Sequence, residues 1–394
     1  TGGGRQMSTG SYTGKEAAYI KRELLRAYLE PLFMVVGQRE LRIGYIDCSA
    51  GPRQKGGQDP ADTSVAVSLG VMEKCHNDLL GKFRRNVQFR GLFIERNKEA
   101  FGSLESFLKS ESWDGVDAQC LKGDFCDLGN DILSWCGNRD FCFFFIDAKE
   151  WRHIAIPTLE PLLCRPSSEF LINFMFDSIV RAHGQTGFEE QMKAIFGEAP
   201  DTSHIGPEER ERFLFNLYRR QLKASAPIIG EAIPRCAHMR VLHPTKNRTV
   251  YDLVYLTWDP LGLVTFMEAS EQLELEQKKV RALAVQSKKV KRSRQLEIFS
   301  ADKFVGDEPA VDLTKIKEYW LAKLSRTRAP KRFGVSEFAD MLEETGWFME
   351  DFQKAFQELE REGKVKNLAS TGMRTGNPVR YWANGNRGEV LEKV

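Results

Sequence analysis

The sequence predicts an α/β protein built on a mostly parallel sheet and followed by a smaller unit of helices and a hairpin. Three observations carry this prediction. Short apolar runs alternate with segments of helical periodicity over the first two thirds of the chain, as in successive βαβ units. Four of the runs end in an acidic or amide residue. A basic stretch at 277–294 then precedes a region with a different pattern.

The first apolar run, 42–48, is too short for a stable helix, and its β-branched and aromatic residues favour a buried strand. The turn after it contains Ser49 and Gly51, and a glycine there lets the backbone approach a ligand closely. A helical pattern follows at 62–75. Open α/β sheets hold nucleotides with a strand, a small-residue turn and a helix in this order, although such turns also occur without a ligand.

The remaining elements follow in order. The run at 141–147 is the most apolar in the chain, as expected of a central parallel strand that is buried on both faces. Further strands are expected at 89–95, 118–128 with its turn, 169–174, and in an antiparallel pair at 240–242 and 251–257. Helices are expected at 14–32, 98–109, 188–196, 207–224 and 261–275.

Polar side chains end four of the strands, namely Asp47, Glu95, Asp147 and Asn173. The carboxyl ends of parallel strands meet at one edge of a sheet, where α/β proteins bind ligands. We therefore expect these residues to share a crevice. Glu95 would be placed to accept both hydroxyls of a ribose, although a solvated acid is the alternative. Asp124 is expected in the turn after the third strand.

Composition restricts the functional classes. The net charge of +2 is close to neutral, so any nucleic-acid surface must be local. No apolar run is long enough to span a membrane, and we expect a soluble, cytoplasmic protein without a membrane partner. The 8 cysteines lack a paired C-x-x-C array, which favours reduced thiols and no metal site. Residues 1–7 are interpreted as a remnant of an expression tag.

The region after 276 is expected to bind nucleic acid. Its basic stretch can neutralise phosphates, although a solvated helical linker would have the same composition. Helices at 313–324, 335–344 and 349–362, with a hairpin formed by 364–368 and 378–382, predict a winged helix-turn-helix. Helix 349–362 is acidic, which disfavours contact with phosphates, and winged helices also bind proteins. The wing is basic, however, so we favour DNA over a partner protein, with the wing as the main contact. The candidate nucleic-acid residues are Lys278, Lys279, Lys288, Lys289, Lys291, Arg292, Lys364, Lys366, Arg374 and Arg380.

Seven blocks in this chain resemble the three-Cys-motif partner (TcmP) family, whose core is similar to a class I S-adenosylmethionine-dependent methyltransferase. The blocks are the helix at 21–28, YIDCSAGP at 45–52, FIERN at 93–97, GDF at 123–125, FFFIDAKEW at 143–151, LINFMFDSIVR at 171–181 and YDLVYLTWDPLGLVTFMEA at 251–269. The resemblance implies a Rossmann-like methyltransferase sheet with one antiparallel strand. It also implies a partner protein with a three-cysteine motif.

By the same resemblance, Asp47, Ser49 and Gly51 would lie near the methionine part of S-adenosylmethionine, Glu95 at its ribose and Asp124 at its adenine amino group. Asp147 would face the transferred methyl group, and Asn173 is the second candidate catalytic residue. Two positions depart from the pattern. Ser49 replaces the first glycine of the loop, and Asp147 is followed by Ala148-Lys149-Glu150 instead of a proline and an aromatic residue.

These features predict four segments. They are residues 1–7, a methyltransferase-like domain at 8–276 with a helical insertion at 183–238, a basic linker or helix at 277–300, and a winged-helix domain at 301–394. The functional expectation is a methyltransferase-like protein that acts on nucleic acid, DNA more than RNA. The alternative is a non-catalytic binding or adaptor protein that keeps the fold and works with a partner protein.

Overall fold

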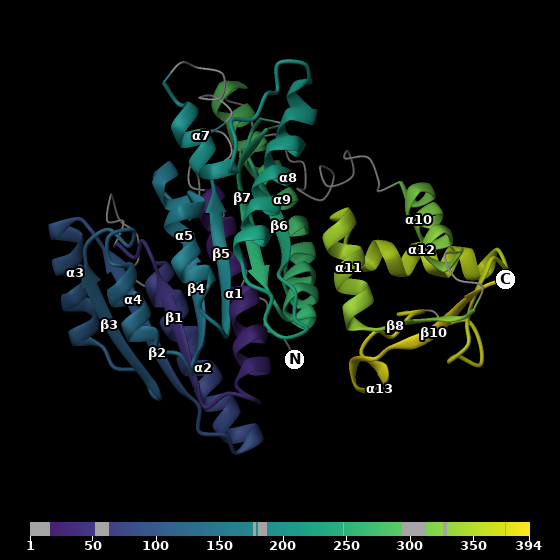
Figure 1. Ribbon diagram of the computed structural model, residues 1–394, viewed down its shortest axis with the longest axis horizontal. Coiled ribbons are helices and arrows are strands. Elements are labelled where there is room, and N and C mark those ends of the chain that lie inside the picture. The colour runs from purple at the N-terminus through teal and green to yellow at the C-terminus, as the bar shows by residue number, and fades with distance from the viewer. Residues whose placement is uncertain are drawn as a thin grey trace.

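The computed structural model describes residues 16–51, 63–175, 179, 187–246, 248–293, 312–325, 329–374 and 376–394. An α/β body with helices on both faces of a sheet lies beside a smaller C-terminal unit (Figure 1). No helix among the described residues is both long and apolar enough to cross a lipid bilayer.

The body is organised around a seven-stranded sheet with the order β3-β2-β1-β4-β5-β7-β6. Strands β1 to β5 run parallel, and β7 is antiparallel to both of its neighbours. The predicted Rossmann-like, mostly parallel sheet with one antiparallel strand is thus confirmed. The strands are β1 (Arg42–Asp47), β2 (Gln88–Glu95), β3 (Val116–Lys122), β4 (Phe141–Ile146), β5 (Ser168–Phe174), β6 (Arg235–Leu242) and β7 (Thr249–Thr257).

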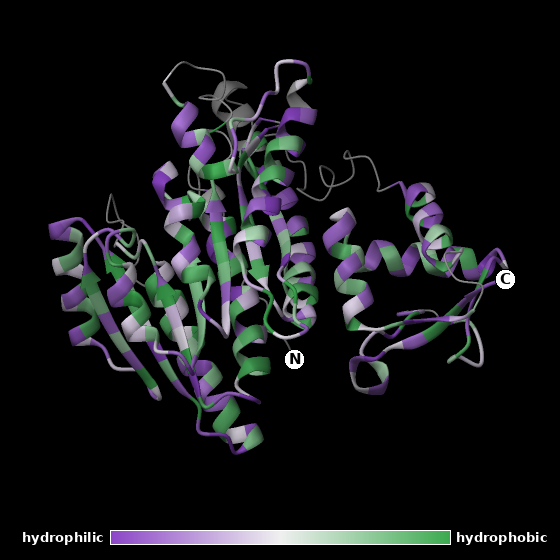
Figure 2. Cartoon of the chain, viewed as in Figure 1, coloured by the Kyte–Doolittle hydropathy of each residue, from purple (hydrophilic) through white to green (hydrophobic). Residues whose placement is uncertain are grey.

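Two hydrophobic cores lie on opposite faces of this sheet. In β4, Phe143 and Phe145 belong to one core and Phe144 and Ile146 to the other, which explains why the strand is apolar without alternation. The central strands are accordingly green in Figure 2, while most helices carry both colours. The first core is covered by α1 (Glu16–Val36), α2 (Ser64–Phe83), α3 (Lys98–Ser110) and α9 (Pro260–Ser293), and the second by α4 (Gly129–Cys136), α5 (Ile156–Leu163), α7 (Glu189–Phe196) and α8 (Pro207–Ser225).

Some boundaries differ from the predicted ones. Strand β6 begins at Arg235, five residues before the predicted start at 240. Helix α9 does not end at 275 but continues through the basic stretch to Ser293. Helices α4 and α5 were not predicted, because each has only eight residues and α5 contains Pro161, a residue that normally interrupts helices.

The C-terminal unit contains α10 (Leu313–Ser325), α11 (Val335–Thr345) and α12 (Met349–Arg361), and its core is built around Trp320. The three predicted helices are confirmed. Its antiparallel sheet has the order β8-β10-β9 and consists of β8 (Lys331–Phe333), β9 (Val365–Asn367) and β10 (Glu389–Lys393), with the short α13 (Ala383–Asn386) before β10. The winged-helix interpretation of this topology stays a prediction.

The predicted hairpin partner in this unit was wrong. Strand β9 pairs with β10 and not with 378–382. Side chains occupy the backbone groups of that segment instead. The amide of Gln353 bonds both the N–H and the C=O of Val379, at 3.0 and 2.9 Å, and Asn367 donates to the C=O of Pro378 at 2.8 Å. These bonds leave less of the segment's backbone available for a strand ladder.

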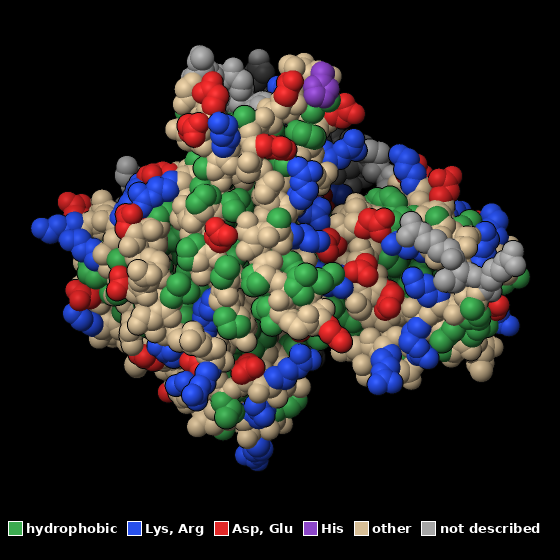
Figure 3. All heavy atoms as spheres, in the orientation of Figure 1, with side chains coloured by type: hydrophobic (Ala, Val, Ile, Leu, Met, Phe, Trp, Pro, Cys, Tyr) green, Lys and Arg blue, Asp and Glu red, His purple; other side chains and the backbone are tan. Residues whose placement is uncertain are grey.

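Charged residues join the C-terminal unit to the body. Arg235 at the start of β6 pairs with Asp340 of α11, and Lys223 of α8 reaches Glu343 at 2.5 Å. Tyr381 donates a hydrogen bond to Glu268 of α9. In Figure 3, blue side chains of the body and red side chains of the C-terminal unit lie along this junction. Because several of these groups are partly buried, they hold the two parts together more effectively than surface pairs would.

Candidate active site

The carboxyl ends of β1 and β4 mark the point where the strand order of the sheet reverses. Ligands of open α/β sheets bind outside the carboxyl ends of the strands at such a point. Asp47 ends β1 and Asp147 directly follows β4, while Glu95 ends β2 and Asn173 lies near the end of β5. The structure therefore places all four predicted strand-end residues along one edge.

Asp47 is buried and organises the first turn. Its Oδ1 accepts the N–H of Ser49 at 3.0 Å, and its Oδ2 accepts the hydroxyl of Ser64, at the start of α2, at 3.1 Å. Burial raises the pKa of Asp47 to about 6, although the bond from Ser49 opposes that rise. Ser49 thus contributes its backbone N–H to the turn.

Gly51 and Glu95 lie against each other. A Cβ atom on Gly51 would be 1.9 Å from Oε2 of Glu95, so only glycine permits this approach. The other oxygen, Oε1, accepts the N–H of Asn97 at 2.6 Å, which fixes the carboxylate at the end of β2. The two residues were predicted to contact the same ligand, and they are in direct contact at the carboxyl edge of the sheet.

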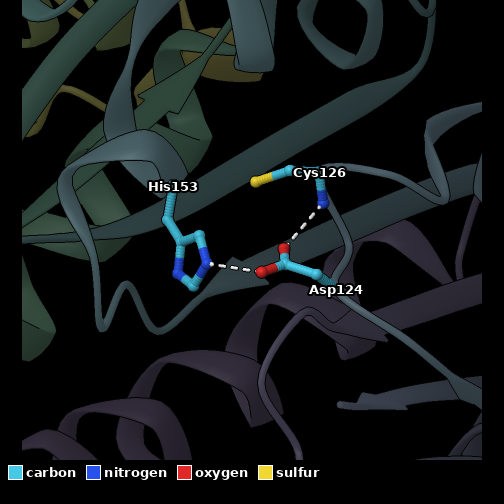
Figure 4. Close-up of side chains that lie close together, drawn as sticks. All are labelled: Asp124, Cys126 and His153. Carbon is cyan, nitrogen blue, oxygen red and sulfur yellow. Dashed lines mark hydrogen bonds and ion pairs between the residues drawn. The ribbon is translucent and has the colours of Figure 1, made fainter. Parts of the chain in front are cut away.

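Asp124 is held by a chain of hydrogen bonds (Figure 4). Its Oδ1 accepts the N–H of Cys126 at 3.1 Å, and its Oδ2 lies 3.3 Å from Nε2 of His153. The N–H of Lys149 points at Nδ1 of His153 at 3.2 Å. Nδ1 must therefore accept, which places the imidazole proton on Nε2, where it is donated to Asp124. Burial acts to raise the pKa of Asp124, but the bonds from Cys126 and His153 outweigh it and lower the pKa.

The same cluster has a composition that could hold a metal ion. The ligand atoms of Asp124, Cys126 and His153 all lie within 4.8 Å of one another. A histidine that binds metal through one nitrogen normally donates a proton from the other. Here the other nitrogen faces the N–H of Lys149. This second contact favours a hydrogen-bonded cluster over a metal centre.

A small hollow of about 10 Å³ lies beside this cluster, which is room for about one water molecule. Ser49, Glu95, Asp124 and His153 are among the residues that line it. Arg96 also lines it, pairing with Glu150 and lying 3.6 Å from Asp124. Exposed ion pairs of this kind contribute little free energy. Movement of the half-exposed Arg96 side chain would therefore enlarge the hollow at small cost.

Asp147 is not an isolated carboxylate. Lys21 of α1 pairs with its Oδ2 at 2.7 Å, and the amide nitrogen of Asn173 donates to its Oδ1 at 2.8 Å. All three residues are less than a tenth exposed. Sequence reasoning predicted a helix at 14–32 but missed this role of Lys21. The position of Lys21 in the helix could not reveal it, because a lysine that faces a buried acid and a lysine beside the apolar face of a helix have the same spacing from the apolar residues.

The predicted nucleic-acid residues are distributed over two regions. On α9, Lys279 is exposed and Lys278 is half-buried. The side chains of Lys288, Lys289, Lys291 and Arg292 lie outside the described residues, as does Arg294. In the C-terminal unit, Lys364, Lys366 and Arg380 are exposed. Arg374 is committed to an ion pair with Glu389 at 2.8 Å, which makes it a structural residue of the unit.

The sequence matches no protein-family model, and no curated protein matches it. Among solved structures, protein LPL1258 from Legionella pneumophila str. Philadelphia 1, assigned to family DUF519, is similar at 9% identity with a TM-score of 0.39, covering 70% of this chain and 94% of that one. Loganic acid methyltransferase with SAH is similar at 13% identity with a TM-score of 0.25, covering 99% and 98%. Because both TM-scores are low, the description of the fold rests on the strand order and directions.

Proposed function

We propose that this chain binds S-adenosylmethionine at the carboxyl edge of its sheet and acts as a methyltransferase-like protein on nucleic acid, DNA in preference to RNA. One observation carries the proposal. At the point where the strand order reverses, the turn after β1 is built by a buried aspartate and brings Gly51 so close to Glu95 that any larger residue would have to displace the carboxylate. Such a turn at such a point is the usual means of holding an adenosine moiety.

The residues present fit the cofactor by their chemistry. Glu95 supplies a fixed carboxylate for ribose hydroxyls, and Asp124 is an ionised acceptor oriented by His153 for the adenine amino group. Asp47 supports the turn that would receive the methionine part. The bound cofactor would supply an electrophilic methyl group. The chain's own residues would bind, orient and exclude water from the groups that react.

The nucleic-acid part of the proposal rests on charge. Lys279 on α9 and Lys364, Lys366 and Arg380 of the C-terminal unit are exposed and could contact phosphates. The winged-helix interpretation and the partner with a three-cysteine motif, which the TcmP resemblance implies, belong to this proposal. The second candidate function is a non-catalytic adaptor. The ion pair that occupies Asp147 favours it, because a carboxylate that is already held by a lysine and an amide is poorly placed to take a proton from a substrate.

Titration calorimetry with S-adenosylhomocysteine tests the cofactor site. We expect binding by the wild type and a loss of at least about tenfold in Gly51→Ala, since the new Cβ must displace Glu95. Gly102→Ala is the matched control, because a Cβ there meets nothing within 4 Å. Absence of binding by the wild type, or equal binding by Gly51→Ala, contradicts the proposal. Cofactor binding without transfer to DNA or RNA would favour the adaptor.

A further inference from the structure

We infer that the amide oxygen of Asn173 receives an N–H group of the substrate, and that the substrate is a nucleobase with an exocyclic amino group. The inference rests on the proposed function, because it assigns the substrate class of the same site. It starts from Oδ1 of Asn173, which is buried and has no hydrogen-bond partner among the described residues. Buried acceptors are nearly always paired, so such an oxygen indicates a missing donor.

The orientation of this oxygen is fixed. Oδ1 of Asp147 is a carboxylate oxygen and can only accept, so the amide of Asn173 must turn its nitrogen toward it, at 2.8 Å. Asp147 is in turn held by Lys21 at 2.7 Å. A flip of the amide would bring two oxygens together. The lysine, the aspartate and the asparagine therefore act in series to present one uncharged acceptor.

The position of Asn173 points to the reacting end of the site. Side chains of β5 alternate between the two faces of the sheet. Those of Ile172 and Phe174 enter the second core, and that of Leu171 enters the first core, on the same face as Asn173. Asn173 therefore lies on the face of the sheet covered by α1, where Lys21 and Asp147 meet it. It is two strands from β1, on the opposite side from Glu95 and Asp124. A cofactor bound over Glu95 and Asp124 would leave the Asn173 side of the edge for the substrate.

The chemistry of the acceptor selects the substrate. An uncharged carbonyl oxygen can accept one N–H of an amino group and leave the nitrogen lone pair available. Bases with a carbonyl at the same position, such as hypoxanthine and uracil, would place an oxygen against Oδ1. Adenine and cytosine carry the amino group. Lys21 disfavours a cationic amine, because its own charge lies in the same cluster.

Fluorescence anisotropy of the full chain with saturating S-adenosylhomocysteine tests the inference. The probes are labelled single strands of oligo(dA), oligo(dI), oligo(dC) and oligo(dU). We expect the wild type to bind one amino strand about five- to tenfold more tightly than its carbonyl counterpart, as for one uncharged hydrogen bond. Asn173→Leu, which is close in shape, should remove this preference. Asn138→Leu, an exposed asparagine before β4, is the control and should keep it.

Each other outcome is decisive. Equal binding of the amino and carbonyl strands by the wild type, or a preference retained in Asn173→Leu, overturns the inference. Loss of S-adenosylhomocysteine affinity in Asn173→Leu would assign the oxygen to the cofactor instead. If Asn173→Leu does not fold, Asn173→Ala is used with the same criteria. If neither the wild type nor the variants bind S-adenosylhomocysteine, the proposed function fails. The amino and carbonyl oligonucleotides are then compared without S-adenosylhomocysteine, and this comparison still decides the role of Asn173.

Discussion

Two buried polar clusters lie at opposite ends of the same strand, and only one of them has an unpaired group. At the carboxyl end of β5, Asn173 contacts the Lys21–Asp147 pair and keeps one amide oxygen without a partner among the described residues. Near the amino end, Glu169 meets Tyr28, Tyr255 and Thr257. There both carboxylate oxygens are occupied, Oε1 by Thr257 at 2.8 Å and Oε2 by Tyr255 at 2.7 Å and Tyr28 at 3.1 Å.

Both clusters are built from the same two elements. Lys21 and Tyr28 are two helical turns apart on one face of α1, and Glu169 and Asn173 are four residues apart on one face of β5. At a rise of about 1.5 Å per helical residue and 3.3 Å per strand residue, the Lys21–Tyr28 and Glu169–Asn173 spacings have similar lengths. Helix α1 therefore runs antiparallel to β5 and serves a different purpose at each end.

The amino-end cluster leaves no room for a ligand. A Cβ atom on Gly262 of α9 would lie 2.7 Å from the hydroxyl of Tyr255 and 3.0 Å from Glu169. The cluster is a closed network inside the layer between sheet and helices. A buried polar group with all its partners stabilises one arrangement of a core, whereas one with an open position can receive a ligand. This contrast separates a structural site from a binding site on one strand.

The largest effect is expected at the closed cluster. Glu169→Leu removes the acceptor of three hydroxyl groups and should lower the free energy of unfolding by about 4 kcal/mol, measured in urea. The folded fraction should bind S-adenosylhomocysteine as the wild type does, since Glu169 lies away from the carboxyl edge. Asn173→Leu loses only the one N–H that is donated to Asp147, which keeps its contact with Lys21, and should lower the free energy of unfolding by about 2 kcal/mol, half the effect of Glu169→Leu. Comparable destabilisation by both variants would remove the distinction between the clusters.

A pH titration isolates the same glutamate with a somewhat smaller effect. Burial raises the pKa of Glu169 from 4.5 to about 7, although bonds from Tyr255 and Thr257 act against the rise. Between these values the folded chain retains a proton that the unfolded chain has released, so stability falls as pH rises. The free energy of unfolding of the wild type, relative to that of Glu169→Gln, should fall by about 3 kcal/mol from pH 4.5 to 7.5.

Other buried acids titrate in both proteins and cancel in this difference. They include Asp47, with a pKa of about 6, and Asp252, whose pKa burial raises to about 7. Urea midpoints at a series of pH values provide the measurement. A wild-type-minus-variant difference that stays constant over the window would show that Glu169 is not protonated in the folded protein near neutral pH.

The sequence was sufficient for the sheet and for the strand ends, because apolar runs that end in Asp47, Glu95 or Asp147 report local structure directly. It could not give the partners of those residues. Lys21 meets Asp147 across 126 positions of sequence, and His153 meets Asp124 through a short 3-10 helix (Trp151–Ile154, η2) that has no strong pattern. Pairings of this kind depend on how helices pack on the sheet. The hairpin in the C-terminal unit failed for the same reason, since Gln353 bonds the backbone of Val379 from another element.

The smallest expected effect decides how the carboxyl edge recognises adenine. His153→Leu removes the donor that orients Asp124 and leaves the packing against Phe125. We expect S-adenosylhomocysteine to bind about fivefold more weakly, as for one lost hydrogen bond, and S-inosylhomocysteine, which lacks the amino group, to be unaffected. His153→Gln can still donate and is the matched control. An equal loss for both ligands would mean that His153 only supports the fold.

If zinc restored or strengthened binding by the wild type after treatment with a chelator, Asp124, Cys126 and His153 would be a metal centre, and the open carboxyl edge would differ from the closed amino edge by holding an ion.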